Sequence, residues 1–174
     1  MSRIDDESQF RQWLEEHAGL LMKVVRSFAD GPADSEDLLQ EILLQVWLSM
    51  PGFRADAKAT TWLYRVALNT ALAWKRKETR HRNRRRDFPL ALEVADPSVT
   101  ANDTREEREA VDRLYEAIHS LVPADRALVL LYLDGLCYSE MAEVIGISES
   151  NVGVRLNRIK KCLATQLRVP DDVS

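Results

Sequence analysis

Apolar residues recur at steps of three and four in two stretches of this chain, and this spacing constrains the fold more than any other feature. Such spacing places the apolar side chains on one face of an α-helix. It predicts helices over the following segments: residues 8–29, 35–50, from about 60 onward, 111–122, 125–134 and two short helices within 138–161. Only six Gly and six Pro occur among 174 residues, which argues against a loop-rich β fold. We therefore expect an all-α protein.

Residues 87–110 separate the two stretches, and we expect them to be an acidic, flexible linker. Pro89 and Pro97 oppose a continuous helix there, and residues 87–117 carry nine acidic and three basic side chains. Residues 1–86 and 111–174 are each long enough for one small helical domain. The prediction is two small helical domains joined by a flexible linker.

Positive charge is concentrated in residues 75–86, which hold eight Lys or Arg and one Glu in a chain of net charge −4. Trp62, Tyr64 and Trp74 precede this run. Clustered cations attract phosphates, and aromatic rings can stack on unpaired bases, so the segment favours nucleic-acid binding. A solvated helix end followed by a basic linker is the alternative.

The predicted helix over residues 35–50 has two unlike faces. Its core stripe contains Leu38, Ile42 and Val46, and its opposite face combines polar side chains with two leucines. Exposed leucines on a polar face suggest a patch that binds a partner. Scattered exposed leucines are also common on protein surfaces, so the pattern alone leaves both interpretations open.

Residues 138–161 have the spacing of a helix-turn-helix motif. The small Ala142 lets two helices cross closely, Gly146 suits the turn, and Ser148 is a suitable N-cap. The outward face of the second helix then carries polar and basic side chains at i, i+4, i+7 and i+10: Asn151, Arg155, Arg158 and Lys161. Such a face can enter the major groove of DNA. An αα-hairpin with ordinary surface cations is the alternative.

No set of residues indicates catalysis, a metal or a cofactor. His17, His81 and His119 are far apart in sequence, and Cys137 and Cys162 lack the spacing of zinc ligands. No apolar run is long enough for a transmembrane helix, and the N-terminus lacks the apolar stretch of a signal peptide. We therefore expect a cytoplasmic protein that is not an enzyme, needs no cofactor or metal, and does not insert into a membrane.

Taken together, these segments resemble the extracytoplasmic-function (ECF) group of bacterial RNA polymerase sigma factors. DSEDLLQEILLQVWLSMPGFR, residues 34–54, looks like the helix that binds core polymerase. TTWLYRVALNTALAWKRK, residues 60–77, looks like the helix that melts promoters and recognises the minus-ten element. IHSLVPADRALVLLYLDGLCYSEMAEVIGIS, residues 118–148, looks like the domain that reads the minus-thirty-five element. The order of the segments and the acidic linker between them also match the family.

The resemblance implies roles for individual residues. Contacts to core polymerase are expected from one face of the first segment: Asp37, Gln40, Glu41, Leu44, Trp47 and Leu48. Contacts to the minus-ten element are expected from these residues: Phe53, Lys58, Trp62, Tyr64, Arg65, Asn69, Lys75 and Arg76. Contacts to the minus-thirty-five element are expected from the second helix-turn-helix helix and its start: Ser148, Ser150, Asn151, Arg155, Asn157, Arg158 and Lys161. For Trp47 and Trp62, packing within the protein is the alternative to contact with a partner.

The resemblance also implies a function and a set of partners. Residues 1–86 would be sigma region 2 and residues 111–174 sigma region 4, acting on core RNA polymerase through its β′ clamp helices and β flap. The chain would direct polymerase to promoter DNA and help to open it, under the control of an anti-sigma factor. Gly153 and Val154 stand where the family often has a basic residue followed by Ser, so the resemblance does not fix the exact upstream base preference.

Two other functions fit parts of the sequence. A stand-alone transcriptional regulator would use the helix-turn-helix as a dimer on palindromic DNA, with residues 1–86 as a dimerisation or sensing bundle. A helical adaptor would bind only proteins and would show little salt-dependent affinity for DNA. The adaptor leaves the basic run of residues 75–86 unexplained.

Overall fold

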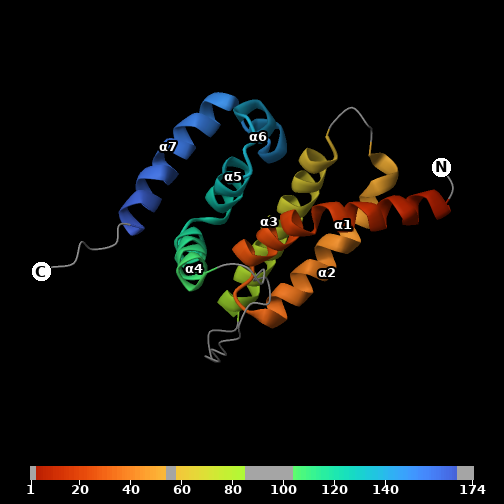
Figure 1. Ribbon diagram of the computed structural model, residues 1–174, viewed down its shortest axis with the longest axis horizontal. Helices are drawn as coiled ribbons and strands as arrows, with labels where there is room; N and C mark the ends of the chain where they lie inside the picture. Colours follow the sequence, from red (N-terminus) through yellow and green to blue (C-terminus); the bar gives the residue numbers. More distant parts are fainter. Residues whose placement is uncertain (1–2, 54–57, 85–103, 168–174) are drawn as a thin grey trace, which may run out of the picture. The chain divides into compact units, whose positions relative to one another are not determined.

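The computed structural model describes residues 3–53, 58–84 and 104–167, and the regular structure within these ranges is entirely helical (Figure 1). The chain divides into two compact units, Met1–Asp96 and Pro97–Ser174. The predictions of an all-α protein and of two helical domains are therefore confirmed. Residues 87–103 of the predicted linker lie outside the described residues.

Three long helices build the N-terminal unit: α1 (Arg3–Phe28), α2 (Pro32–Ser49) and α3 (Ala59–Arg84). Each of them contacts the other two, and the 3₁₀ turn Met50–Gly52 closes the end of α2. Apolar side chains at helical spacing meet in a common core: Val24, Val25, Phe28, Leu38, Ile42, Val46, Leu63 and Leu68. The burial of this stripe holds the three helices together as a bundle.

The start of α2 differs from the prediction. The helix begins at Pro32 with Gly31 as its N-cap residue, whereas the sequence suggested a start at residue 35. Proline is well suited to the first helical position because its missing N–H would have no partner there. The Ser35 hydroxyl instead donates to the carbonyl of Gly31 (2.9 Å), inside the first turn.

The described part of the C-terminal unit contains four helices: α4 (Arg105–His119), α5 (Pro123–Leu133), α6 (Tyr138–Ile145) and α7 (Glu149–Gln166). α6 and α7 form the predicted helix-turn-helix. Gly146 joins them with a left-handed φ of 78°, and the hydroxyl of Ser148 accepts a hydrogen bond from the N–H of Asn151 (3.3 Å). Both the turn glycine and the N-cap serine are therefore confirmed.

The boundary between linker and C-terminal unit was predicted too late in the sequence. Residues 105–110, assigned above to the linker, form the first turns of α4. Thr104 and Glu107 make a capping box, in which the Thr104 hydroxyl accepts from the Glu107 N–H (3.3 Å) and the Glu107 carboxylate accepts from the Thr104 N–H (2.7 Å). The bond to the backbone of Thr104 lowers the pKa of Glu107.

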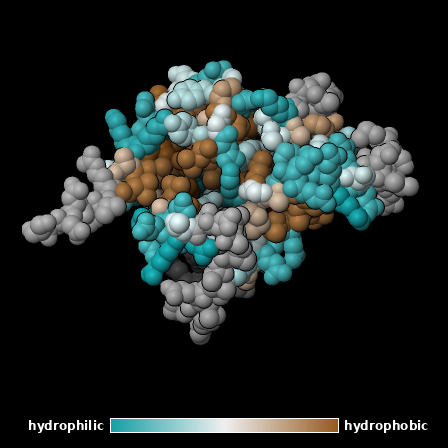
Figure 2. Space-filling view, in the orientation of Figure 1, coloured by the Kyte–Doolittle hydropathy of each residue, from teal (hydrophilic) through white to brown (hydrophobic). Residues whose placement is uncertain are grey.

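On the face drawn in Figure 2, both hydrophilic and apolar side chains of the described residues reach the surface. None of the helices in the described ranges combines the length and apolar character that crossing a membrane requires. The large apolar side chains that stay exposed are the following: Leu44, Leu48, Val111, Val122, Tyr132, Leu133, Tyr138, Val154 and Leu167. Two of them lie on α2 and one lies on α7, two of the three helices expected to bind partners.

Candidate functional site

The outward face of α2 is the first candidate surface. Asp37, Gln40 and Glu41 are exposed there, and Leu44 and Leu48 keep 49% and 61% of their surface exposed. These positions follow one another at steps of three and four, so they share one face of the helix. The helix therefore presents acids, an amide and two leucines together.

Trp47 does not join this exposed face fully. Its side chain is half-buried and meets the ring of Phe10 in α1 edge to face, with ring centroids 5.3 Å apart and an interplanar angle of 74°. Such pairs stabilise by about 0.5–1.5 kcal/mol beyond the area that they bury. Trp47 therefore ties α2 to α1 while keeping part of its surface exposed.

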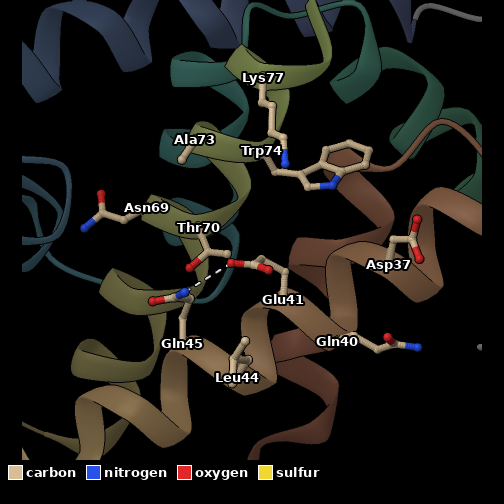
Figure 3. Close-up of a pocket in the computed structure, with 10 residues that line it drawn as sticks. All are labelled: Asp37, Gln40, Glu41, Leu44, Gln45, Asn69, Thr70, Ala73, Trp74 and Lys77. Atoms are coloured by element: carbon tan, nitrogen blue, oxygen red, sulfur yellow. Dashed lines mark hydrogen bonds between the residues drawn. The ribbon is translucent and has the colours of Figure 1, made fainter. Parts of the chain in front are cut away.

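A groove of about 900 Å³ lies between α2 and α3 beside this face (Figure 3). The lining from α2 contains Asp37, Gln40, Glu41, Leu44 and Gln45, and the Gln45 amide donates to the Glu41 carboxylate (3.1 Å). The lining from α3 comes from one face of that helix: Asn69, Thr70, Ala73, Trp74 and Lys77. The groove thus joins the residues predicted for polymerase binding to Asn69, which is predicted for the minus-ten element.

Some of the residues predicted for the minus-ten element are accessible on α3. Lys58, Asn69 and Arg76 are exposed, and Arg65 is half-buried. Three cations and one amide therefore lie within about five helical turns, a suitable spacing for contacts along a strand of DNA.

Phe53 and Trp62 belong to an aromatic cluster with Trp13. The Trp13 ring lies 4.9 Å from Phe53 and 5.4 Å from Trp62, and the Phe53 and Trp62 rings are 5.3 Å apart, all measured between centroids. Trp13 is buried, whereas Phe53 and Trp62 are half-buried. The cluster links α1, the end of the 3₁₀ turn and the first turn of α3, and it fixes the rings of both predicted residues.

The expectation that Tyr64 lies on the surface of α3 is wrong. Its side chain is 1% exposed and is among the largest fully buried side chains of the described residues. The position points into the core of the three-helix bundle, so the phenol ring cannot stack on a base without unfolding this helix. Tyr64 is a packing residue of the N-terminal unit.

Lys75 is also drawn inward, contrary to its predicted role on the DNA backbone. Its ammonium group donates to Asp30 (2.7 Å) and to Glu78 (2.8 Å), and its side chain is 10% exposed. Burial raises the pKa of neighbouring Asp34, and the carboxylates of Glu78 and Asp30 raise it further, while Lys75 lowers it. Lys75 therefore neutralises an acidic cluster that joins α3 to the start of α2.

The outward face of α7 is the second candidate surface. Most of the residues predicted for the minus-thirty-five element are exposed there: Ser148, Ser150, Asn151, Asn157, Arg158 and Lys161. The opposite face is buried against α5 and α6 through Val152, Leu156, Ile159 and Leu163. The helix is thus amphipathic, with donors and cations on the side away from the core.

Arg155 differs from its neighbours on α7. Both its Nε and its terminal nitrogen donate to one carboxylate oxygen of Asp125 in α5 (3.0 and 2.5 Å), and its side chain is 20% exposed. Arg158 donates to the other oxygen of Asp125 (2.8 Å) but keeps most of its side chain exposed. The expectation that Arg155 lies on the outward face is wrong, because the buried Asp125 holds it against α5.

Three contributors to these surfaces were not among the predicted site residues. Trp74 and Lys77 line the groove, and each lies four residues after another lining residue, Thr70 and Ala73 respectively, a helical spacing that is visible in the sequence. Asp125 positions two arginines of α7 from a distance of 30 and 33 residues. No local pattern reveals a pairing over such a separation.

Comparisons with known proteins agree with this division into two units. The sigma-70 region 2 family matches residues 13–81, and the sigma-70 region 4 family matches residues 112–163. The chain is 26% identical to the RNA polymerase sigma factor NccH of Alcaligenes xylosoxydans xylosoxydans, over 94% of this chain and 89% of the relative. It is 27% identical to the ECF sigma factor SigW of Bacillus subtilis, over 78% and 76% of the two chains.

Two solved structures share the fold. The sigma factor RpoE of Bartonella quintana, in complex with the anti-sigma factor NepR, superposes with a TM-score of 0.74 at 19% identity, over 94% of this chain and 99% of the other. CnrH, in complex with the cytosolic domain of CnrY, superposes with a TM-score of 0.66 at 21% identity, over 95% and 91%.

A further relative settles the family. The ECF sigma factor SigF of Caulobacter vibrioides is 32% identical over 84% of this chain and 78% of its own length. Regions 2 and 4 occur here in the family's order, each on its own helical unit. The chain therefore belongs to the ECF group of RNA polymerase sigma factors, which direct the polymerase to its promoters.

Proposed function

We propose that the outward face of α2 is the surface by which this sigma factor binds core polymerase, through the β′ clamp helices. The observation that carries this proposal is the pair of exposed leucines, Leu44 and Leu48, set beside Asp37, Gln40 and Glu41. Large apolar side chains at the centre of a polar patch are typical of protein interfaces. The acids add a charge that a basic partner helix can complement.

We assign promoter opening to α3 in this proposal. Asn69, Arg76 and Lys58 are exposed and suited to contact the separated strand of the minus-ten element. Trp62 and Phe53 take part through the surface that their aromatic cluster leaves exposed. Asn69 shares the groove with the polymerase-binding residues, so polymerase docking and strand capture would be adjacent on the N-terminal unit.

We assign recognition of the minus-thirty-five element to α7. Its exposed side chains combine hydroxyl, amide and cationic groups, which suits simultaneous contacts to base edges and phosphates in the major groove. The β flap of polymerase is the expected protein contact of this C-terminal unit.

We further propose that the chain acts in the cytoplasm as an initiation factor without catalytic activity of its own. An anti-sigma factor is its proposed inhibitor, since the sigma factor RpoE, which shares the fold, was solved with the anti-sigma factor NepR. The groove between α2 and α3 is the proposed place of inhibition, because an inhibitor seated there would cover the polymerase-binding face.

Run-off transcription tests the proposal. Fragmented genomic DNA is transcribed by bacterial core polymerase with and without the chain, and the 5′ ends of the products are mapped. New start sites that share two unlike upstream elements are the expected result. If the chain instead binds palindromic DNA tightly without polymerase and gives no new start sites, it is a stand-alone regulator.

A further inference from the structure

The centre of the outward face of α7 is apolar. Val154 keeps 69% of its surface exposed, more than any other large hydrophobic side chain of the described residues. It lies two residues after Val152 and two before Leu156, both of which are buried. At 3.6 residues per turn this places Val154 about 160–200° around the helix from the core, so it points straight away from the C-terminal unit.

Polar and basic side chains surround Val154 on the same face. Ser150, Asn157 and Lys161 stand at i−4, i+3 and i+7 from it, and all three are exposed. Neighbours on the same helix at these spacings lie side by side. An uncharged branched side chain is thus enclosed by donors on the surface proposed to enter the major groove.

The residues on either side of Val154 in the sequence make contacts within the C-terminal unit. Asp125 holds Arg155 against α5. A Cβ on Gly153 would meet the ring of Tyr138 at 3.4 Å, so this position lies against α6. Val154 is therefore the exposed one of these three residues.

Among the groups exposed in the major groove, one matches a valine. Bases present nitrogen and oxygen donors and acceptors, which a valine cannot bond, and thymine also presents an apolar C5 methyl group. Contact between two apolar groups in a groove that is otherwise filled by polar contacts removes both from water. Phosphate oxygens offer Val154 nothing comparable.

We propose that Val154 contacts the C5 methyl group of a thymine in the minus-thirty-five element, and that it is a specificity-determining residue for this promoter class. The inference rests on the proposed role of α7 as the upstream reader. It assigns direct methyl recognition to Val154, with Asn157 and Lys161 contacting the bases or phosphates beside it.

A methyl-deletion experiment tests this contact. Promoters mapped by run-off transcription are synthesised with each minus-thirty-five thymine replaced in turn by uracil, which keeps the pairing and removes only the methyl group. Holoenzyme made from core polymerase and the full chain is then titrated onto each duplex. At one position we expect an affinity about fourfold lower on uracil than on thymine, the change for one methyl group kept out of water.

Two variants test whether Val154 causes this loss of affinity. Val154→Ala should weaken binding to the thymine duplex and bring the thymine-to-uracil ratio of affinities close to one at that position. Val111→Ala is the matched control, since Val111 is another exposed valine within a helix of the same unit and lies outside α7. This control should leave the fourfold ratio unchanged.

The outcomes separate the inference from the function on which it rests. Specific binding to the upstream element with no ratio that depends on Val154 would overturn the methyl contact and leave the role of α7 intact. Loss of all preference for the upstream element in wild-type holoenzyme would overturn that role, and the methyl contact with it.

Discussion

The ammonium group of Lys75 lies among the carboxylates of Asp30, Asp34 and Glu78, whose oxygens are within 4.8 Å of one another. Replacing Lys75 by Ala leaves these negative charges facing each other, so we expect the free energy of unfolding of the N-terminal unit to fall by about 1–3 kcal/mol. All four tryptophans of the chain are in this unit, so their fluorescence during urea unfolding reports it alone.

A neighbouring lysine provides the control for this measurement. Lys77 is exposed on the same helix, and Lys77→Ala should change the free energy of unfolding by less than about 0.5 kcal/mol. Equal effects of the two substitutions would show that the ion pairs of Lys75 contribute nothing to stability. Lys75 would then be available to DNA, as its position in the basic run first suggested.

The buried carboxylate of Asp125 couples α5 to α7 through Arg155. In a double-mutant cycle of Asp125→Asn and Arg155→Ala, we expect a coupling energy of about 1–3 kcal/mol, because either single change leaves a partly buried charge without its main partner. The C-terminal unit has no tryptophan, so hydrogen exchange of the amides in α5 and α7 is the suitable measurement.

A second cycle with a distant arginine serves as comparison. Arg113 is exposed on α4, and its replacement by Ala should be additive with Asp125→Asn. Additive behaviour of the Arg155 pair as well would mean that Arg155 is free to leave Asp125. In that case a direct contact of Arg155 with a base would regain support.

At the residue scale, helical spacing predicted the exposure of several side chains correctly, although Tyr64, expected at the surface, is buried. The helical spacing of α2 correctly exposes Leu44 and Leu48, and that of α7 correctly exposes Asn157. It failed for Lys75 and Arg155, whose partners lie 45 and 30 residues away in the chain. Helical periodicity contains no information about which distant acid a cation will meet.

At the scale of the element, the outward face of α2 makes the sharpest prediction. Asp37→Arg combined with Leu44→Ala reverses a charge and removes an exposed apolar side chain on the proposed interface. We expect the affinity for core polymerase to fall by about 3 kcal/mol or more, as for truncated interface hot spots. Stability should change little because both positions are exposed.

The control for this double substitution lies on the same helix. Glu36 is exposed in the first turns of α2 and does not line the groove, so Glu36→Arg makes the same change of charge away from the proposed interface. Polymerase affinity, measured by titration of labelled chain with core enzyme, should stay near wild type for this variant. If both variants bind core polymerase equally well, the assignment of this face is wrong.

The ends of the helices were harder to predict than their existence. The stripes of apolar residues gave the positions of α1, α2, α3 and α7 because burial repeats with each turn. The starts of α2 and α4 depend on single residues, Pro32 in one and the capping pair of Thr104 and Glu107 in the other. The spacing of Thr104 and Glu107 is a recognisable capping signal that would have corrected the linker boundary.

For the whole molecule, charge distribution and division into units act together. The chain has a net charge of −4, but residues 57–86 carry ten basic and one acidic side chains at the end of the N-terminal unit. A chain that is acidic elsewhere resists non-specific attachment to DNA, while this segment supplies local attraction to phosphates. In the proposed function, promoter selectivity depends on both units engaging their own elements at once.

This requirement leads to a prediction about promoter spacing. Inserting about five base pairs, half a helical turn, between the two elements moves them to opposite faces of the DNA. One chain docked on one polymerase then reaches only one element. Run-off transcription should therefore fall at least about tenfold, which corresponds to a loss of roughly 1.4 kcal/mol of binding free energy. Inserting a full turn of about ten base pairs returns the two elements to the same face of the DNA but lengthens the distance between them. This promoter should recover less than half of the transcription. Equal transcription from all three promoters would show that only one unit reads DNA.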